Sequence, residues 1–328
     1  MRSASSCASP DVAAPYSFAF DLAHYVIAPE VREGDTLVQV FRLRSGRLVK
    51  VDVASRGTAA APALEFRVAC EEPVSAGDLA EVRGRVSWHL GLDERLGPFY
   101  DLVADDRVLS ASVAFNYGAK GKSAYSLFDA VVDCICAQNT DFRRVYAMRR
   151  DLGIAFGERL EAGGRVYHAA PTPEQLAEAP LESIRACGVG YRDRFLKGVA
   201  EAVVGGVDLE AVRVLPREQA RRELMALPGV GPYTADLALI IGARRRDWMF
   251  LDLYIREALR QFYFDGEPVG DAELRAFAER AWGPYQGWAA LYLTTDTELW
   301  AHEAGKSFRL KSGARSDLSG QAHGRRLS

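Results

Sequence analysis

The residues best suited to chemistry lie in one stretch, 224–256. Its first residues read Leu-Met-Ala-Leu-Pro-Gly-Val-Gly-Pro-Tyr-Thr-Ala-Asp. An apolar helix is expected to end at Leu227, and a second is expected to begin at Pro232, where a proline costs no backbone hydrogen bond. The pattern predicts two helices joined by a short hairpin over 224–242.

The glycines of this hairpin are suited to a phosphate. Gly229 and Gly231 lack a Cβ atom, so they can adopt left-handed backbone angles and let an anion approach main-chain N–H groups. The start of the next helix adds the positive end of a dipole. We therefore expect a sequence-independent contact with a nucleic-acid backbone at Leu227, Gly229, Gly231 and Thr234. The alternative is a helical hairpin that ends in Gly-x-Gly for structural reasons alone.

The whole string is more specific than its glycines. Leu-Pro-Gly-Val-Gly followed by Thr-Ala-Asp and an apolar run resembles the hairpin of the helix-hairpin-helix (HhH-GPD) DNA glycosylases. Those enzymes carry a catalytic carboxylate shortly after the second helix, and Asp252 in Phe250–Arg256 takes the matching place. Cleavage of an N-glycosidic bond builds positive charge on the sugar, which a buried anion stabilises while it assists a water nucleophile. Asp252 also suits the N-cap of its own helix, and the two roles are compatible.

The resemblance extends over about residues 88–299. The segments Cys136–Thr140, Cys187–Arg194 and Trp282–Ala289 are similar to 8-oxoguanine DNA glycosylases, more closely than to the bacterial alkylpurine (3-methyladenine) enzymes. The resemblance implies that the gap left by a flipped base is filled at Gln138 and Asn139. It also implies contacts with the orphaned partner base from Arg144, Tyr191 and Arg192. Helix-surface arginines and a buried tyrosine without such a role are the alternative.

The sequence departs from that family at the position of its amine. Bifunctional 8-oxoguanine enzymes carry a lysine two residues after the second hairpin glycine, where it attacks the sugar, and this chain has Tyr233 there. No lysine lies between Lys197 and Lys306. Because imine formation needs an amine, we predict a monofunctional enzyme that leaves an intact abasic site. A bifunctional glycosylase/lyase is the alternative that this tyrosine opposes.

The base pocket departs from the family as well. By the resemblance, Ala290 and Thr294 replace a glutamine and a phenylalanine that bind oxidised guanine. Leu237 and Thr295 stand where alkylpurine enzymes carry aromatic residues, which leaves Tyr233 as the stacking face. We therefore expect a widened pocket for a bulky modified base, such as the glucosylated hydroxymethylcytosine of some phages, and a defence role. Base excision repair of 8-oxoguanine or alkylated purines is one alternative, and non-catalytic DNA binding through the hairpin is another.

A largely helical body must position these residues. Short alternating runs before residue 87 predict antiparallel strands, and after residue 96 nearly everything reads as helices separated by Gly or Pro. We expect an α+β protein with four parts: a disordered N-terminus (1–15), a β-rich domain (16–92), helical glycosylase domains (93–301) and a basic disordered tail (302–328). The helices expected in the body span Ser126–Gln138, Phe142–Phe156, Pro173–Ala179, Leu181–Ala186, Tyr191–Gly205, Pro216–Leu227, Tyr233–Gly242, Asp252–Phe262, Asp271–Trp282 and Gln286–Leu299.

Composition narrows the remaining questions. The chain has 328 residues, of which 48% are apolar, and its net charge of −3 decides little because a binding face is local. The five cysteines and five histidines are scattered without metal-ligand spacing, so no cofactor is expected. The resemblance implies only a Na or K ion at the hairpin carbonyls of Leu227 and Val230. Since no signal peptide or membrane span is recognisable, we expect a monomer in the cytoplasm, associated with the bacterial nucleoid, whose partner is double-stranded DNA that contains a modified base.

Overall fold

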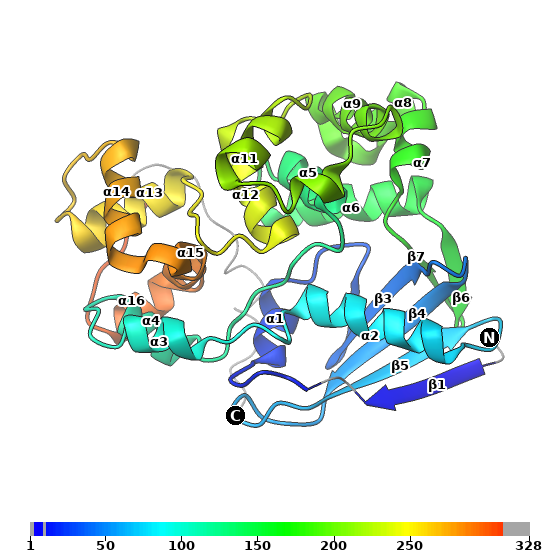
Figure 1. The fold of residues 1–328 in the computed structure, drawn as a ribbon, viewed down its shortest axis with the longest axis horizontal. Helices are drawn as coiled ribbons and strands as arrows, with labels where there is room; N and C mark the ends of the chain where they lie inside the picture. The colour runs from blue at the N-terminus through cyan, green and yellow to red at the C-terminus, as the bar shows by residue number, and fades with distance from the viewer. Residues whose placement is uncertain (1–2, 9–10, 311–328) are drawn as a thin grey trace.

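A computed structural model describes residues 3–8 and 11–310. The N-terminal part is a five-stranded antiparallel sheet in the order β1-β5-β4-β3-β2. Helices α1 and α2 pack on it, with α2 lying along one face (Figure 1). The bounds are β1 (Ser3–Ala8), α1 (Phe18–His24), β2 (Val31–Glu33), β3 (Thr36–Arg42), β4 (Leu48–Ser55), β5 (Leu64–Cys70) and α2 (Ala76–Leu90).

The sheet is covered on both faces. Val49, Val51 and Val53 of β4 are fully buried in one core with α2, because alternate residues of a strand point to one face. On the opposite face, Val38 and Val40 of β3 pack against a hairpin that belongs to the helical body. The strands of that hairpin are β6 (Arg159–Ala162) and β7 (Arg165–His168).

The N-terminal segment differs from the expectation. We expected residues 1–15 to be disordered, yet Ser3–Ala8 forms β1 and pairs with β5 over its whole length. Without β1, the edge of β5 would present unpaired backbone groups, and a paired edge removes that liability. The segment Ser-Ala-Ser-Ser-Cys-Ala carries no large apolar side chain, so its sequence gave no strand pattern.

The helical body has two hydrophobic cores and confirms the expected α+β fold. One core is formed by the helices from α5 through α12. The other is formed by α3, α4 and the C-terminal helices from α13 through α16 (Figure 1). In the part of the chain that the structure describes, no helix has the length and apolar character needed to cross a membrane. The bounds are α3 (Gly97–Leu102), α4 (Leu109–Phe115), α5 (Leu127–Cys136), α6 (Phe142–Phe156), α7 (Pro173–Glu178), α8 (Leu181–Ile184), a π-turn (Arg185–Val189), a 3₁₀ turn (Gly190–Arg192), α9 (Asp193–Val204), α10 (Leu209–Val212), α11 (Arg217–Met225), α12 (Pro232–Ala243), α13 (Leu253–Tyr263), α14 (Asp271–Trp282), a 3₁₀ turn (Gly283–Tyr285), α15 (Gln286–Thr294) and α16 (Thr297–Glu303).

The start of the predicted disordered tail, 302–328, is ordered. Helix α16 continues to Glu303, and Phe308 is buried with its ring 5.0 Å from that of Tyr254 and 5.7 Å from that of Phe262. Phe308 holds this segment on α13 together with two hydrogen bonds between the Gln261 side chain and the backbone of Arg309. The rest of the predicted tail, 311–328, lies outside the described residues.

Glu30 joins the sheet domain to the segment that leads into α5. Its Oε1 accepts a hydrogen bond from Gln39 Nε2 at 2.6 Å and lies 2.6 Å from His89 Nε2, while Oε2 accepts from Lys122 Nζ. Burial alone would raise the pKa of Glu30, but the charges of Lys122 and His89 outweigh it and lower the pKa from 4.5 to about 2. The ionised carboxylate is therefore stabilised in the folded chain.

Replacing Glu30 with glutamine should lower the free energy of unfolding at pH 7 by about 3 kcal/mol, from the size of the pKa shift. Because the folded pKa is below the unfolded one, this contribution is complete above pH 4.5 and disappears as the pH falls towards 2. Urea unfolding at pH 7 and at low pH measures it. Glu174→Gln, at an exposed position, is the control, and a Glu30→Gln deficit of equal size at both pH values would contradict the assignment.

Candidate active site

The expected hairpin is present between α11 and α12. Gly229 has a left-handed φ of +73°, and a Cβ atom there would lie 2.3 Å from the ring of Phe195, so only glycine fits. Gly231 does not share this conformation, contrary to the expectation, because its extended backbone (φ −91°) forms the N-cap of α12. The Leu227 carbonyl accepts the Val230 N–H at 3.2 Å, and the alkali cation at the carbonyls of Leu227 and Val230 stays a prediction.

Thr234 has a different role from the one predicted. Its side chain is buried, and its hydroxyl accepts a hydrogen bond from Gln138 Nε2 at 3.0 Å instead of facing a phosphate. The same amide donates to the Gly229 carbonyl at 2.8 Å. Gln138 is thus anchored to the hairpin and holds the 138–139 loop beside it.

Two of the predicted DNA-contact residues meet at the surface. Asn139 is exposed and left-handed (φ +47°), a conformation that asparagine tolerates, and its Nδ2 lies 3.4 Å from the hydroxyl of Tyr191. Tyr191 is 45% exposed. Arg144 is exposed in the first turn of α6. The insertion and partner-base roles of these three residues stay predictions.

Arg192 is not placed for the predicted contact with a partner base. Only 6% of the residue is exposed, and its guanidinium donates to the carbonyls of Ile135 and Val189, each at 3.2 Å, and to that of Gln138. The sequence could not show that this arginine points inward. In this structure it fixes the loop that carries Asn139.

Asp252 is the N-cap of α13 and also faces a cavity. Its Oδ1 accepts the Ile255 N–H at 2.7 Å, so both expected roles are structurally compatible. Burial raises the pKa of Asp252 above the ordinary 3.8, and the hydrogen bonds from the helix N–H groups offset only part of that rise. The carboxylate is thus less stable in the folded chain than in water.

A group of hydrogen bonds and ion pairs that the sequence analysis missed holds the segment before Asp252. Arg275 donates to the Met249 carbonyl at 2.8 Å and to the buried Asp236 at 3.0 Å, and its guanidinium stacks 4.4 Å from the ring of Trp248. Asp236 also accepts from Arg221 at 2.7 Å. The acid of the Thr-Ala-Asp string, Asp236, was the feature of the sequence that could have indicated these contacts.

The cavity beside Asp252 has a volume of about 800 Å³. Tyr233 and Leu237 of α12 and Thr294 of α15 line it, as predicted for a base pocket. The ring of Tyr233 lies 5.9 Å from that of Phe250, edge to face, and burial raises the pKa of the phenol so that it stays neutral. The Thr294 hydroxyl donates to the Ala290 carbonyl at 2.8 Å.

Ala290 was wrongly assigned to this pocket. It is 1% exposed and belongs to the core of α13 to α16, whereas Gly287 and Leu291 line the cavity. One residue along a helix rotates the side chain by about 100°. A one-residue error in the alignment of α15 therefore exchanges a core position for a pocket position.

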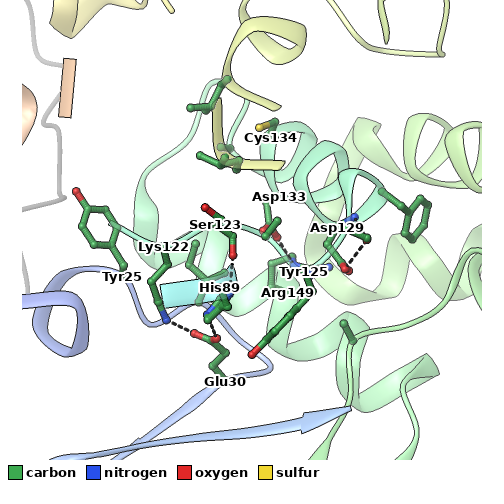
Figure 2. A pocket seen from close by; sticks show the side chains of 18 of the residues that line it. Tyr25, Glu30, His89, Lys122, Ser123, Tyr125, Asp129, Asp133, Cys134 and Arg149 are labelled. Carbon is green, nitrogen blue, oxygen red and sulfur yellow. Dashed lines mark hydrogen bonds and ion pairs between the residues drawn. The ribbon is translucent and has the colours of Figure 1, made fainter. Parts of the chain in front are cut away.

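Two lysines outside the interval 197–306 also line the cavity. Lys122 donates a hydrogen bond to the carboxylate of Glu30 (Figure 2). Lys120 is fully buried and donates to the Ala13 carbonyl at 2.7 Å, and burial lowers its pKa to about 8. The sequence argument against an amine overlooked both, because they approach the site from a distant segment.

Asp252→Asn should make the protein more stable at pH 7, because asparagine keeps the N-cap and removes a charge that burial disfavours. The folded pKa is raised, so the gain should be present above it and should vanish below pH 3.8, where both states are protonated. Thermal unfolding against pH measures this, with Asp101→Asn on the exposed face of α3 as control. An equal or lower midpoint at pH 7 would refute the assigned pKa direction.

Known proteins are similar to this chain in sequence and in fold. Residues 132–284 match the model of the HhH-GPD superfamily base excision DNA repair proteins. A probable N-glycosylase/DNA lyase of Methanothermobacter thermautotrophicus is 25% identical over 251 residues, 71% of this chain and 78% of the relative. A 3-methyladenine DNA glycosylase from Archaeoglobus fulgidus superposes with a TM-score of 0.73 at 21% identity, over 88% of this chain and 96% of that one. The 8-oxoguanine glycosylase/lyase of Clostridium acetobutylicum, in complex with double-stranded DNA, superposes with a TM-score of 0.65 at 20% identity, over 84% of this chain and 98% of that one.

The family match covers the hairpin, the 138–139 loop and Asp252. In the structure, Gln138 donates a hydrogen bond to the Gly229 carbonyl of the hairpin, and Asp252 lines one cavity with Tyr233 of α12. The predicted resemblance is thereby confirmed: residues 132–284, a little under half of the chain, are similar to the HhH-GPD superfamily of base excision DNA repair proteins.

Proposed function

We propose that the protein is a monofunctional DNA N-glycosylase that flips a bulky modified base out of duplex DNA and hydrolyses its N-glycosidic bond. The match of residues 132–284 to the HhH-GPD base excision DNA repair proteins supports a DNA glycosylase, and the proposal adds the mode of cleavage and the class of base. The observation that carries it is the presence of Asp252 and Tyr233 on the wall of one large cavity. Tyr233 occupies the position where bifunctional enzymes carry their lysine.

In the proposed reaction, the bond from the base nitrogen to C1′ breaks and the electron pair leaves with the base, which takes up a proton. The Asp252 carboxylate stabilises the positive charge that develops on the sugar. It also accepts a proton from the attacking water as the water oxygen bonds to C1′. Tyr233, a neutral phenol, packs against the flipped base. The product is an intact abasic site.

The DNA is held from one face. The N–H groups at the start of α12 and the hairpin at Gly229 supply a phosphate site, and the exposed Asn139 and Tyr191 are placed to enter the duplex. In this proposal the enzyme acts as a monomer on the bacterial nucleoid or on invading DNA.

The size of the cavity supports a bulky base. Its volume of about 800 Å³ lies in the upper part of the roughly 300–1,000 Å³ typical of ligand sites, and Leu237 and Thr294 leave it without aromatic walls at those places. A glucosylated hydroxymethylcytosine fits this description, and its removal from phage DNA is the defence role that we propose. Repair of 8-oxoguanine or alkylated purines is the second candidate, because relatives with those names share the fold.

Abasic-site formation on duplexes that carry glucosylated hydroxymethylcytosine, 8-oxoguanine, alkylated purines or uracil tests the substrate. We expect release of the glucosylated base, with strand cleavage only after alkali, and a loss of about 100-fold or more in Asp252→Asn. Asp101→Asn should keep wild-type activity. Release of 8-oxoguanine or an alkylated purine alone would move the protein to the repair candidate, and tight binding without release of any base would make it a binding protein.

Borohydride trapping tests the monofunctional mode separately. Because Lys122 is paired with Glu30 and Lys120 is buried, the wild-type protein should form no covalent adduct with substrate DNA or with an abasic site. An adduct that disappears in Lys122→Ala would reveal a lyase that uses this amine. An adduct that persists in that variant would also overturn the monofunctional mode and would point to another amine.

A further inference from the structure

The cavity does not end at Asp252. Tyr233, Asp252 and Cys134 all line it. Beyond Cys134 the wall becomes charged, with Asp133 of α5 and Arg149 of α6 facing the Glu30, His89 and Lys122 cluster (Figure 2). All five of these residues line the same cavity. We call these five residues the polar wall.

The polar wall consists of buried groups that are paired with one another. Arg149 Nε lies 2.6 Å from Asp133 Oδ1 in an ion pair. His89 Nε2 lies 2.6 Å from Glu30 Oε1. Arg149 is 4% exposed and His89 is 7% exposed, and all four residues line the cavity. A guanidinium has five N–H donors and a carboxylate about four acceptor positions, so the paired groups keep capacity for further hydrogen bonds and the wall is suited to a polar ligand.

The charges of the polar wall indicate the class of ligand. The carboxylates of Glu30 and Asp133 oppose the cations of Lys122 and Arg149, and Asp129 adds a further acid on the cavity. Such a wall does not favour an anion such as phosphate, since its acids would repel it. A hydroxyl group both donates and accepts, so it can satisfy the carboxylates and the nitrogen donors together.

We propose that the polar wall is a subsite for a neutral, multiply hydroxylated substituent carried by the flipped base. This inference rests on the proposed function, in which the base enters the cavity at Asp252. The hydroxyls donate to Asp133 and Glu30 and accept from Arg149, Lys122 and His89. The ring of Tyr125 lies on His89, 4.4 Å between centroids at 10°, and closes that end of the cavity with an aromatic face.

Binding in an inactive background tests the subsite without requiring catalysis. In Asp252→Asn, the dissociation constants are measured for two duplexes that differ only in hydroxymethylcytosine against its glucosylated form. We expect the glucosylated duplex to bind about tenfold or more tightly, and Asp133→Asn or Arg149→Met in that background to remove the preference without weakening the unglucosylated duplex. Asp101→Asn should leave the preference unchanged.

The outcomes separate this subsite from the proposed function. Equal affinities of Asp252→Asn for the two duplexes, or a preference that survives both wall variants, would overturn the subsite even if the wild type releases a modified base. Failure of the wild type to release any base would overturn the proposed function, whatever the affinities are. Asp133→Asn nearly preserves shape, and an unfolding midpoint near that of its parent shows that a lost preference is not lost folding.

Discussion

Glu30 carries a charge that must be balanced inside the molecule, where the sheet domain meets the helical body. Burial alone would neutralise it, but Lys122 and His89 hold its pKa near 2. Glu30 precedes β2, His89 ends α2, and Lys122 lies just before α5, so one carboxylate ties together three segments that are distant in the sequence. The cavity lies along this contact. Its shape therefore depends on the pairing and not on either domain alone.

The proposed catalytic carboxylate, Asp252, depends on a different constraint. Asp252 accepts helix N–H groups, which lower its pKa, yet burial raises the pKa by more, so the fold holds an anion in surroundings that disfavour it. Such a group keeps its position only if the backbone around it is fixed. Arg275 supplies that support on the side away from the cavity, since it grips the Met249 carbonyl and is itself held by Asp236. The stability of the site thus comes from ion pairs that touch no substrate.

Local patterns in the sequence predicted the parts of this site that depend on neighbouring residues. The hairpin and the N-cap position of Asp252 are written in consecutive residues, and both are present. Features that depend on distant contacts were missed or misplaced. Ala290 faces the core instead of the pocket, and Arg192 points inward and donates to carbonyl groups. Lys122, which the sequence analysis did not consider, lines the cavity from a segment distant in the sequence. The helix expected over 286–299 is interrupted because Asp296 adopts a left-handed conformation (φ +49°) between α15 and α16, a choice that apolar periodicity does not encode.

The pairing of Glu30 with Lys122 also links the mode of cleavage to the choice of base. The pairing engages the Lys122 amine in an ion pair with Glu30, whereas imine formation with a sugar needs a free amine. The same pairing leaves Lys122 with further N–H donors on the cavity wall, since an ammonium has three. A hydrolytic glycosylase needs a carboxylate at the sugar but no amine as the nucleophile. A lysine on the cavity wall can therefore bind the base instead of attacking the sugar. We propose that Tyr233 at the hairpin and the polar wall beyond it belong to one arrangement, in which Asp252 acts at the sugar and Lys122 binds the substituent of the base.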